Sequence, residues 1–139
     1  LDVIEHIKED ELAMRELKRV LKPNGILITF VPAFMILWGI TDVISEHFTR
    51  YTKKDFKKKI LSSGLDIVRI SYFNFFLFIP ILIVRKIVNL FNIKVKNENN
   101  MTPGIINTIL YFIFSIELVL LNYINLPFGV SLFCISKKK

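Results

Sequence analysis

The chain has 139 residues, a length that suits one domain, and 53% of the residues are hydrophobic while 22% are charged. With only 5 Gly and 5 Pro, this composition excludes a disordered or collagen-like chain. The 13 Phe are more apolar material than one small soluble core ordinarily needs, so we expect a membrane or another hydrophobic partner. The single Cys134 excludes an internal disulfide, and two histidines, His6 and His47, are too few for a structural zinc cluster. We therefore expect a reducing environment and no bound metal.

The net charge of +7 is concentrated in the second half of the chain. Residues 1–64 carry 11 basic and 9 acidic side chains, or +2, whereas residues 65–139 carry 8 and 3, or +5. The basic residues of the second half flank apolar runs, which favours the surface of an anionic membrane over nucleic acid. We predict no nucleic-acid partner and a cytoplasmic protein, with peripheral attachment to the cytoplasmic membrane face as the second prediction. The opening on Leu1, without a leader pattern, predicts no signal peptide and a start inside a longer polypeptide.

The first elements in chain order predict a β-α-β unit. Residues 1–4 are a short apolar run, interpreted as the end of a buried strand. A helix is expected over residues 9–21, where apolar residues recur at helical spacing between an acidic start and a basic end. The turn at 23–25 then leads into an unbroken apolar run at 26–31, which predicts a second buried strand. This order predicts a crossover and a parallel sheet.

The middle of the chain predicts a ligand-binding loop followed by a helix and a strand. Residues 33–52 show no sustained period and are interpreted as a long loop with one helical turn. Because this loop leaves the carboxyl end of a buried strand, we expect it to be functional. A helix is predicted to begin at Thr52, capped together with Asp55, and a strand covers 65–72. The predicted buried stripe of this helix is Phe56, Ile60 and Leu61.

The second half is predicted as two apolar helices and a last strand. Residues 75–84 contain no polar side chain and continue to residue 91 as an amphipathic helix, and residues 92–104 form a polar linker. A second apolar helix is expected over 105–124, and a strand over 130–136.

A length argument opposes a membrane-spanning role for these helices. A bilayer core of about 30 Å takes roughly 20 helical residues. The apolar stretch 105–121 gives 17, and it contains Glu117, whose burial mid-membrane would cost on the order of 3 kcal/mol. The other apolar stretch, 73–91, contains Pro80, Arg85 and Lys86. We therefore predict a helical hairpin that lies on or in the cytoplasmic leaflet.

Four motifs carry a family resemblance. Residues 1–7 read Leu-Asp-Val-Ile-Glu-His-Ile, residues 21–25 read Leu-Lys-Pro-Asn-Gly, and residues 47–52 read His-Phe-Thr-Arg-Tyr-Thr. In this order and spacing they resemble the C-terminal half of class I S-adenosylmethionine-dependent methyltransferases, within the small-molecule branch that includes quinone-biosynthesis enzymes. Residues 127–131, Pro-Phe-Gly-Val-Ser, are similar to the closing-strand motif of a membrane-leaning subset.

The resemblance implies an α/β fold, the C-terminal part of a Rossmann-like methyltransferase sheet with an inserted apolar helical pair. The implied divisions are 1–72 for the C-terminal half of the methyltransferase domain, 73–125 for the apolar insertion, and 126–139 for the closing strand and basic tail. The last strand should then run antiparallel beside both 26–31 and 65–72.

The family's glycine-rich cofactor loop is missing from these residues, since no G-x-G pattern occurs in the chain. We expect the missing N-terminal half to be supplied by the same or another chain. The chain alone is then predicted to be inactive and to bind the cofactor weakly or not at all.

The site residues follow from the resemblance together with their chemistry. The cofactor is S-adenosylmethionine, with Asp2, Val3 and His6 as its expected contacts. His47 is the candidate general base, because an ordinary imidazole pKa suits that role. Glu5 and His6, on an extended strand exit, should face opposite ways, so that at most one of them is functional. The expected acceptor-binding residues are Trp38, Arg50 and Tyr51, and ordering of the loop is the alternative role for Arg50 and Tyr51.

The sequence predicts methyl transfer from the sulfonium of S-adenosylmethionine to a hydrophobic small-molecule or lipid-like acceptor. The alternative is a non-catalytic, membrane-associated or scaffold fragment, which the absent glycine loop favours. A G-x-G loop after a strand in the upstream sequence would distinguish the enzyme from the fragment.

Overall fold

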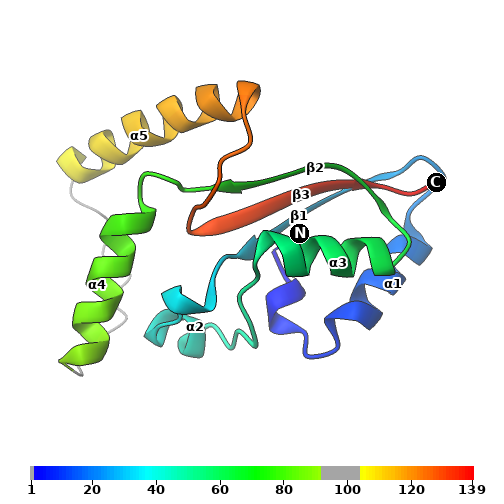
Figure 1. The fold of residues 1–139 in the computed structure, drawn as a ribbon, viewed down its shortest axis with the longest axis horizontal. Helices are drawn as coiled ribbons and strands as arrows, with labels where there is room; N and C mark the ends of the chain where they lie inside the picture. Colours follow the sequence, from blue (N-terminus) through cyan, green and yellow to red (C-terminus); the bar gives the residue numbers. More distant parts are fainter. Residues whose placement is uncertain (1, 92–103) are drawn as a thin grey trace.

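The computed structural model describes residues 2–91 and 104–139, and these form a mixed α/β fold around a three-stranded sheet (Figure 1). The outer strands are β1 (Ile26–Pro32) and β2 (Asp66–Phe73). Between them lies β3 (Ser131–Lys137), which pairs antiparallel with both. This arrangement confirms the predicted place of the C-terminal strand. It also means that β1 and β2 run parallel to each other without pairing directly.

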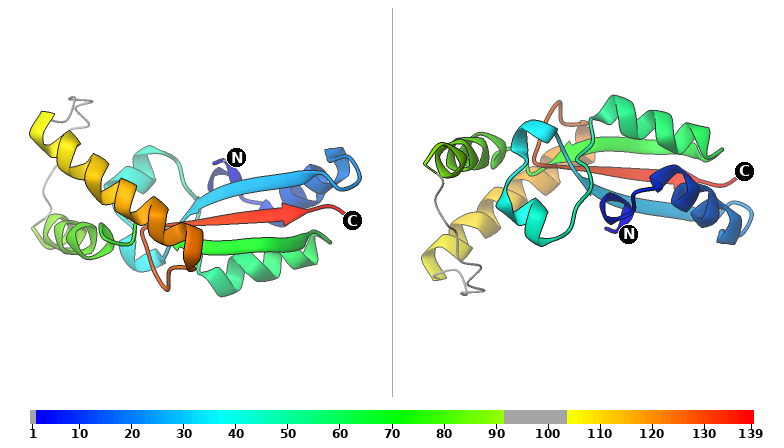
Figure 2. Two further views of the ribbon diagram at one scale, coloured as in Figure 1. Left: turned by 90° about the horizontal axis from the view of Figure 1, so that it is seen from above. Right: turned by 90° about the horizontal axis from the view of Figure 1, so that it is seen from below.

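Helices cover the two faces of the sheet unequally. On one face lie α1 and α3, whereas the C-terminal part of α5 crosses the opposite face near the end of the sheet (Figures 1 and 2). In the described residues the helical segments, with η for a 3-10 helix, are η1 (Ile4–His6), α1 (Asp10–Val20), η2 (Met35–Leu37), α2 (Ile40–Ile44), α3 (Lys53–Ser62), α4 (Phe78–Leu90) and α5 (Gly104–Tyr123). The predicted linker 92–104 lies outside the described residues apart from Gly104, which begins α5.

The hydrophobic core lies between the sheet and the helices α1 and α3. Along β1 the side chains alternate, with Leu27, Thr29 and Val31 buried against these helices and Ile28 and Phe30 on the open face. The prediction of a strand buried on both faces is therefore wrong for β1, because the opposite face is covered only where α5 reaches it. The largest fully buried side chains come from the helices, the 3-10 turns, β3 and the residue before β2: Phe56, Ile4, Met14, Leu37, Ile60, Leu132 and Leu65.

Helix α3 begins as predicted, because the Thr52 hydroxyl accepts a hydrogen bond from the Asp55 backbone N–H at 3.2 Å. Phe56 and Ile60 are buried as predicted, but Leu61 is 49% exposed. One residue along a helix turns the side chain by about 100°, which carries Leu61 away from the sheet.

Residues 2–4 do not form the predicted strand. They lead into the helical turn η1, closed by hydrogen bonds from the His6 N–H to the Val3 carbonyl and from the Ile7 N–H to the Ile4 carbonyl. In the described part of the chain β1 pairs with β3 alone, so this segment has no strand to join. Parallel pairing between the first segment and β1 was therefore a wrong prediction.

Helices α4 and α5 carry nearly half of the exposed large apolar side chains of the described residues. No residue of α4 is buried, and the buried residue of α5 is Glu117. Among the described residues, α5 is the one helix long and apolar enough to cross a membrane, and only 6% of its apolar window is buried in the molecule. The helix has 20 residues, which agrees with the predicted range 105–124 and exceeds the 17-residue apolar stretch used in the length argument.

Two charges that were predicted to oppose membrane burial are used inside the molecule. The Glu117 carboxylate accepts hydrogen bonds from the backbone N–H groups of Asn74 and Phe75, the latter at 2.9 Å. Arg85 of α4 donates to the Asp42 carboxylate at 2.8 Å. These contacts fix both helices to the loops that leave the sheet.

Candidate active site

A polar cavity of about 550 Å³ lies at the carboxyl ends of β1 and β2. Open α/β sheets place their ligands at this end of the strands. The lining residues come from the strand ends, from the segment around η1 and from the loop after α2: Phe30, Val31, Pro32, Phe73, Ser131, Asp2, Glu5, His6, Ser45 and His47.

The loop beside the cavity is organised around one buried carboxylate, that of Asp42 in α2. Its Oδ1 accepts hydrogen bonds from Arg50 Nε at 2.7 Å and from His47 Nδ1 at 3.0 Å, and its Oδ2 accepts from the Gly39 N–H at 2.9 Å and from Arg85 Nη1 at 2.8 Å. Burial alone would raise the pKa of Asp42, but these donors outweigh it and lower the pKa to about 2. Asp42 is therefore an ionised acceptor at neutral pH.

This carboxylate sets the orientation of the His47 ring. Because an ionised carboxylate only accepts hydrogen bonds, Nδ1 of His47 must carry the proton that it shares with Asp42. In the neutral imidazole this leaves a lone pair on Nε2, which can accept a proton. The His6 ring lies edge-on to the His47 ring, with centroids 4.6 Å apart.

Glu5 joins the two histidines at the cavity. The N–H of Phe48 donates to the Glu5 carbonyl at 2.7 Å, which ties the loop after His47 to η1. The Glu5 side chain is buried, and its Oε2 has no hydrogen-bond partner in the part of the chain that the structure describes. Burial, reinforced by the neighbouring Asp2 carboxyl, raises the pKa of Glu5 to about 7.

The expectation that Glu5 and His6 face opposite ways is wrong. One ligand atom from each of Glu5, His6 and His47 lies within 4.8 Å of the others. The expectation assumed an extended backbone, whereas successive side chains on the observed 3-10 turn are only about 120° apart. The prediction of no bound metal rests on the histidine and cysteine residues alone and does not consider this carboxylate.

The predicted cofactor contacts are divided between two places. Asp2 and His6 line the polar cavity. The side chain of Val3 instead lines a separate apolar hollow beside α1, together with Ala13 and Leu17.

The predicted acceptor residues lie outside both the polar cavity and the apolar groove described below. Arg50 is buried between Asp42 and the Ala33 carbonyl, to which it donates at 3.1 Å. Tyr51 is in the core and donates to Asp10 Oδ2 at 2.7 Å, and Trp38 is half-buried at the end of η2. In this structure Arg50 and Tyr51 hold the loop in place, and acceptor binding by the three residues stays a prediction.

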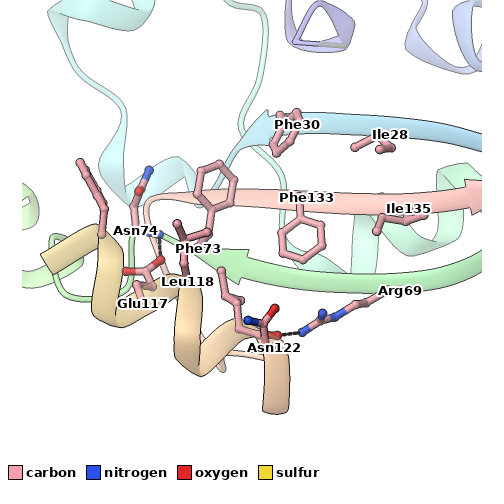
Figure 3. Close-up of a pocket in the computed structure, with 12 residues that line it drawn as sticks. Ile28, Phe30, Arg69, Phe73, Asn74, Glu117, Leu118, Asn122, Phe133 and Ile135 are labelled. Atoms are coloured by element: carbon pink, nitrogen blue, oxygen red, sulfur yellow. Dashed lines mark hydrogen bonds between the residues drawn. The ribbon is translucent and has the colours of Figure 1, made fainter. Parts of the chain in front are cut away.

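An apolar groove of about 570 Å³ adjoins the polar cavity and was not predicted from the sequence (Figure 3). It lies between the open face of the sheet and α5, and Phe30 and Phe73 line both the groove and the polar cavity. The other groove residues are mostly apolar: Ile28, Phe133, Ile135, Phe114, Leu118 and Leu121, with Arg69, Asn74, Glu117 and Asn122 at its border. Successive side chains of a strand point to opposite faces of the sheet, and both sets along β1 and β3 are largely apolar. This pattern is the sequence signal for a second apolar face.

The sheet and its cavity agree with the predicted fold. A β1-β3-β2 sheet with antiparallel β3 in the middle, and a polar cavity at the carboxyl ends of the outer strands, corresponds to part of a Rossmann-like methyltransferase domain. A family model described as a methyltransferase domain matches residues 1–29, from the segment before η1 into β1. This match confirms the predicted resemblance to class I S-adenosylmethionine-dependent methyltransferases, whereas the narrower quinone-biosynthesis-like branch stays a prediction.

Among solved structures, the chain is similar to phosphoethanolamine N-methyltransferase 2 of Haemonchus contortus, a structure in complex with S-adenosyl-L-methionine. The identity is 17% and the TM-score is 0.48. The similarity covers 99% of this chain and 31% of that chain, so the chain spans about a third of the length of that enzyme. No curated protein matches the chain.

Proposed function

We propose that this chain provides the acceptor-binding side of an S-adenosylmethionine-dependent methyltransferase that acts on a hydrophobic small-molecule or lipid-like acceptor. The observation that carries the proposal is the meeting of the apolar groove and the polar cavity at Phe30 and Phe73. An acceptor with an apolar tail in the groove would present its polar end to the cavity that holds His47.

The residues at the cavity fit the proposed cofactor in part. The cofactor supplies the methyl group on a positively charged sulfonium. Asp2 and Glu5 offer carboxyl groups at the cavity for a cationic or hydroxyl-bearing ligand, and His6 adds an imidazole edge. The chain's own contribution is then the orientation of the two reactants and the exclusion of water by the groove.

His47 has the geometry of a proton acceptor for the methylated atom. Its Nδ1–H is held by Asp42, so the Nε2 lone pair has a fixed tautomer and a fixed direction. This lone pair takes the proton from an acceptor hydroxyl or amine as the methyl group arrives. An acceptor that needs no deprotonation would use only the positioning by the groove.

The exposed surface of α4 and α5 supports attachment to the cytoplasmic face of a membrane. Twelve positions on the two helices that are at least half exposed carry large hydrophobic side chains: Ile79, Ile83, Val84, Leu90, Ile105, Ile109, Tyr111, Phe112, Ile116, Leu118, Val119 and Tyr123. An acceptor dissolved in the lipid would reach the groove along α5, whose residues form one of its walls.

Cofactor binding tests the first part of the proposal. S-adenosylmethionine is titrated calorimetrically into the chain alone and into the product of the reading frame extended upstream. We expect weak or absent binding to the chain, and a low-micromolar Kd, about −8 kcal/mol, for an extended product that contains a G-x-G loop. Tight binding by the chain alone would place the cofactor site elsewhere, and no binding by either would favour the scaffold alternative.

Groove variants test the acceptor. With the extended product, methyl transfer is measured on a phenol that bears an isoprenoid tail and on the same phenol without it. Phe133→Asp should raise KM for the tailed acceptor at least tenfold with little effect on the short one, whereas Val68→Asp, on an exposed position of β2 outside the groove, should change neither. Equal KM values for both acceptors in the wild type would contradict a hydrophobic acceptor.

A further inference from the structure

Two imidazoles and one carboxylate converge at the wall of the polar cavity. Glu5 and His6 come from η1, and His47 comes from the loop after α2, 41 positions further along the chain. One ligand atom from each lies within 4.8 Å of the other two. Two histidines and a carboxylate are the protein ligands of many catalytic zinc sites and of facial-triad iron sites.

The state of Glu5 points independently to a ligand. Its side chain is 2% exposed, and within the described residues its Oε2 has no hydrogen-bond partner. A buried carboxylate oxygen without a partner is unfavourable, because it has lost water and gained nothing in exchange. A cation between Glu5 and the two rings would satisfy this oxygen.

The surroundings of His47 are those of a metal-binding histidine. Such a histidine commonly donates its second ring N–H to a carboxylate, which fixes the tautomer and makes the free nitrogen a better ligand. Asp42 plays this part for His47, and Arg50 and Arg85 in turn hold Asp42. The nitrogen that remains free is Nε2.

We propose that Glu5, His6 and His47 form a binding site for a divalent transition-metal cation such as Zn²⁺, with an open coordination position toward the polar cavity. A tetrahedral site with bonds of about 2.1 Å places its ligand atoms about 3.4 Å apart. The cluster must therefore close by up to about 1.4 Å, and the His6 side chain can move because it is exposed. Asp2, which also lines the cavity, is a second carboxylate within its reach.

The open position deepens the proposed function, and this part of the inference rests on that function. A hydroxyl group bound to the cation loses its proton more readily, because the positive charge stabilises the oxyanion. His47 would then act as a ligand of the cation, and the cation would replace it as the group that activates the acceptor oxygen. Binding of the cation itself requires no methyl transfer.

Cobalt binding tests the site directly on the chain as it stands. Co²⁺ is titrated into chelator-treated protein, and the visible absorption of four- or five-coordinate Co²⁺ is followed, with Zn²⁺ as a competitor. We expect saturation at one equivalent and loss of the spectrum on addition of Zn²⁺. Glu5→Gln and His6→Ala should each weaken binding at least tenfold, and His47→Ala should remove the spectrum. Asp42→Asn should weaken binding by about 10- to 100-fold through the orientation of His47.

The matched control is Glu11→Gln, an exposed acidic residue of α1 outside the cluster, which should bind Co²⁺ as the wild type does. Circular dichroism establishes that each variant is folded, and Glu5→Gln keeps the shape of the side chain. A wild type that fails to bind Co²⁺, or binding that is insensitive to Glu5→Gln and His6→Ala, overturns the proposal. Cation binding without methyl transfer would leave the metal site standing and contradict the proposed function alone.

Discussion

Two regions of this molecule use apolar residues in opposite ways. The sheet with α1 and α3 buries them, and Phe56, Ile60 and Leu132 are fully inaccessible. Helices α4 and α5 leave theirs on the surface, and the buried residue of α5 is the charged Glu117. The first region has the organisation of a folded core, whereas the second leaves a large apolar surface exposed.

Polar contacts join the second region to the first. Arg85 reaches Asp42, and Glu117 accepts from the backbone after β2. Arg69 of β2 donates to the Leu121 and Ile124 carbonyls at the end of α5, the second of these at 3.1 Å. A cation at this end also complements the helix dipole. Charges in an apolar helix can therefore serve as anchors to the rest of the fold.

The largest expected effect is the cost of truncating a core side chain. Phe56→Ala should lower the free energy of unfolding by about 3–5 kcal/mol, because it removes a buried ring and leaves a cavity. Phe112→Ala, at a 60% exposed position of α5, should change it by less than about 0.5 kcal/mol. Urea unfolding followed by circular dichroism measures both. Similar losses for the two variants would contradict the contrast between the regions.

Lowering the pH should weaken the contact between Asp42 and Arg85 that links the two regions. Its pKa is about 2 in the folded chain against 3.8 for the unfolded reference, so Asp42 contributes stability above pH 3.8 that is lost as the pH falls toward 2. The shift corresponds to about 2 kcal/mol. The difference in unfolding free energy between wild type and Asp42→Asn should therefore shrink by about that amount from pH 6 to pH 2. A difference that stays constant with pH would show that the carboxylate is not held in this way.

Lipid binding should depend on α5 and not on the region formed by the sheet with α1 and α3. The chain should float with vesicles that contain phosphatidylglycerol, and high salt should weaken this binding only in part, because apolar insertion persists while charge is screened. Val119→Asp should weaken binding about tenfold, or about 1.4 kcal/mol, whereas Leu12→Asp, at a similarly exposed position of α1, should have little effect.

Two outcomes of the flotation experiment would revise this assignment. Failure to float with either anionic or neutral vesicles would leave the exposed face of α4 and α5 to a protein partner. Resistance to both salt and alkaline extraction would instead indicate that α5, with its 20 residues, crosses the bilayer.

The smallest effect is expected for the Arg85 anchor. Arg85→Met should lower the unfolding free energy by about 1 kcal/mol, because the Arg85 side chain is partly exposed and Asp42 keeps three other donors. Lys86→Met, at the exposed neighbouring position, should have no measurable effect. Equal thermal unfolding curves for the two variants would show that Arg85 does not anchor α4.

The elements that depend on local pattern could be predicted, and the contacts between distant loops could not. Helical spacing and the Thr52 cap located α1 and α3, and apolar runs bounded by turns located the strands. The place of β3 came from the family resemblance. The cluster of Glu5 with His47 depends on the Asp42 hydrogen bonds and on the helical turn η1, and neither leaves a periodic pattern in the sequence.

The same reason explains why the hydrogen-bond partners of two residues were not predicted. Arg85 was interpreted from its apolar neighbours in sequence, although its partner lies 43 positions away. Tyr51 stands in a polar stretch that predicted ligand binding, yet its hydroxyl donates to Asp10 in the interior. A single sequence records the neighbours of a residue along the chain, and these contacts are set by the fold as a whole.

The Asp42 carboxylate has a mechanical consequence. One of its oxygens holds the His47 ring, and the other holds Arg85 on the apolar helix α4. The carboxylate is a rigid, planar group, so a tilt of α4 pulls on one oxygen and turns the other. The positions of the helix and the imidazole are therefore coupled through this group. A shift of α4 on a lipid surface would therefore move the Asp42 carboxylate, and this movement would change the orientation of the His47 ring at the cavity.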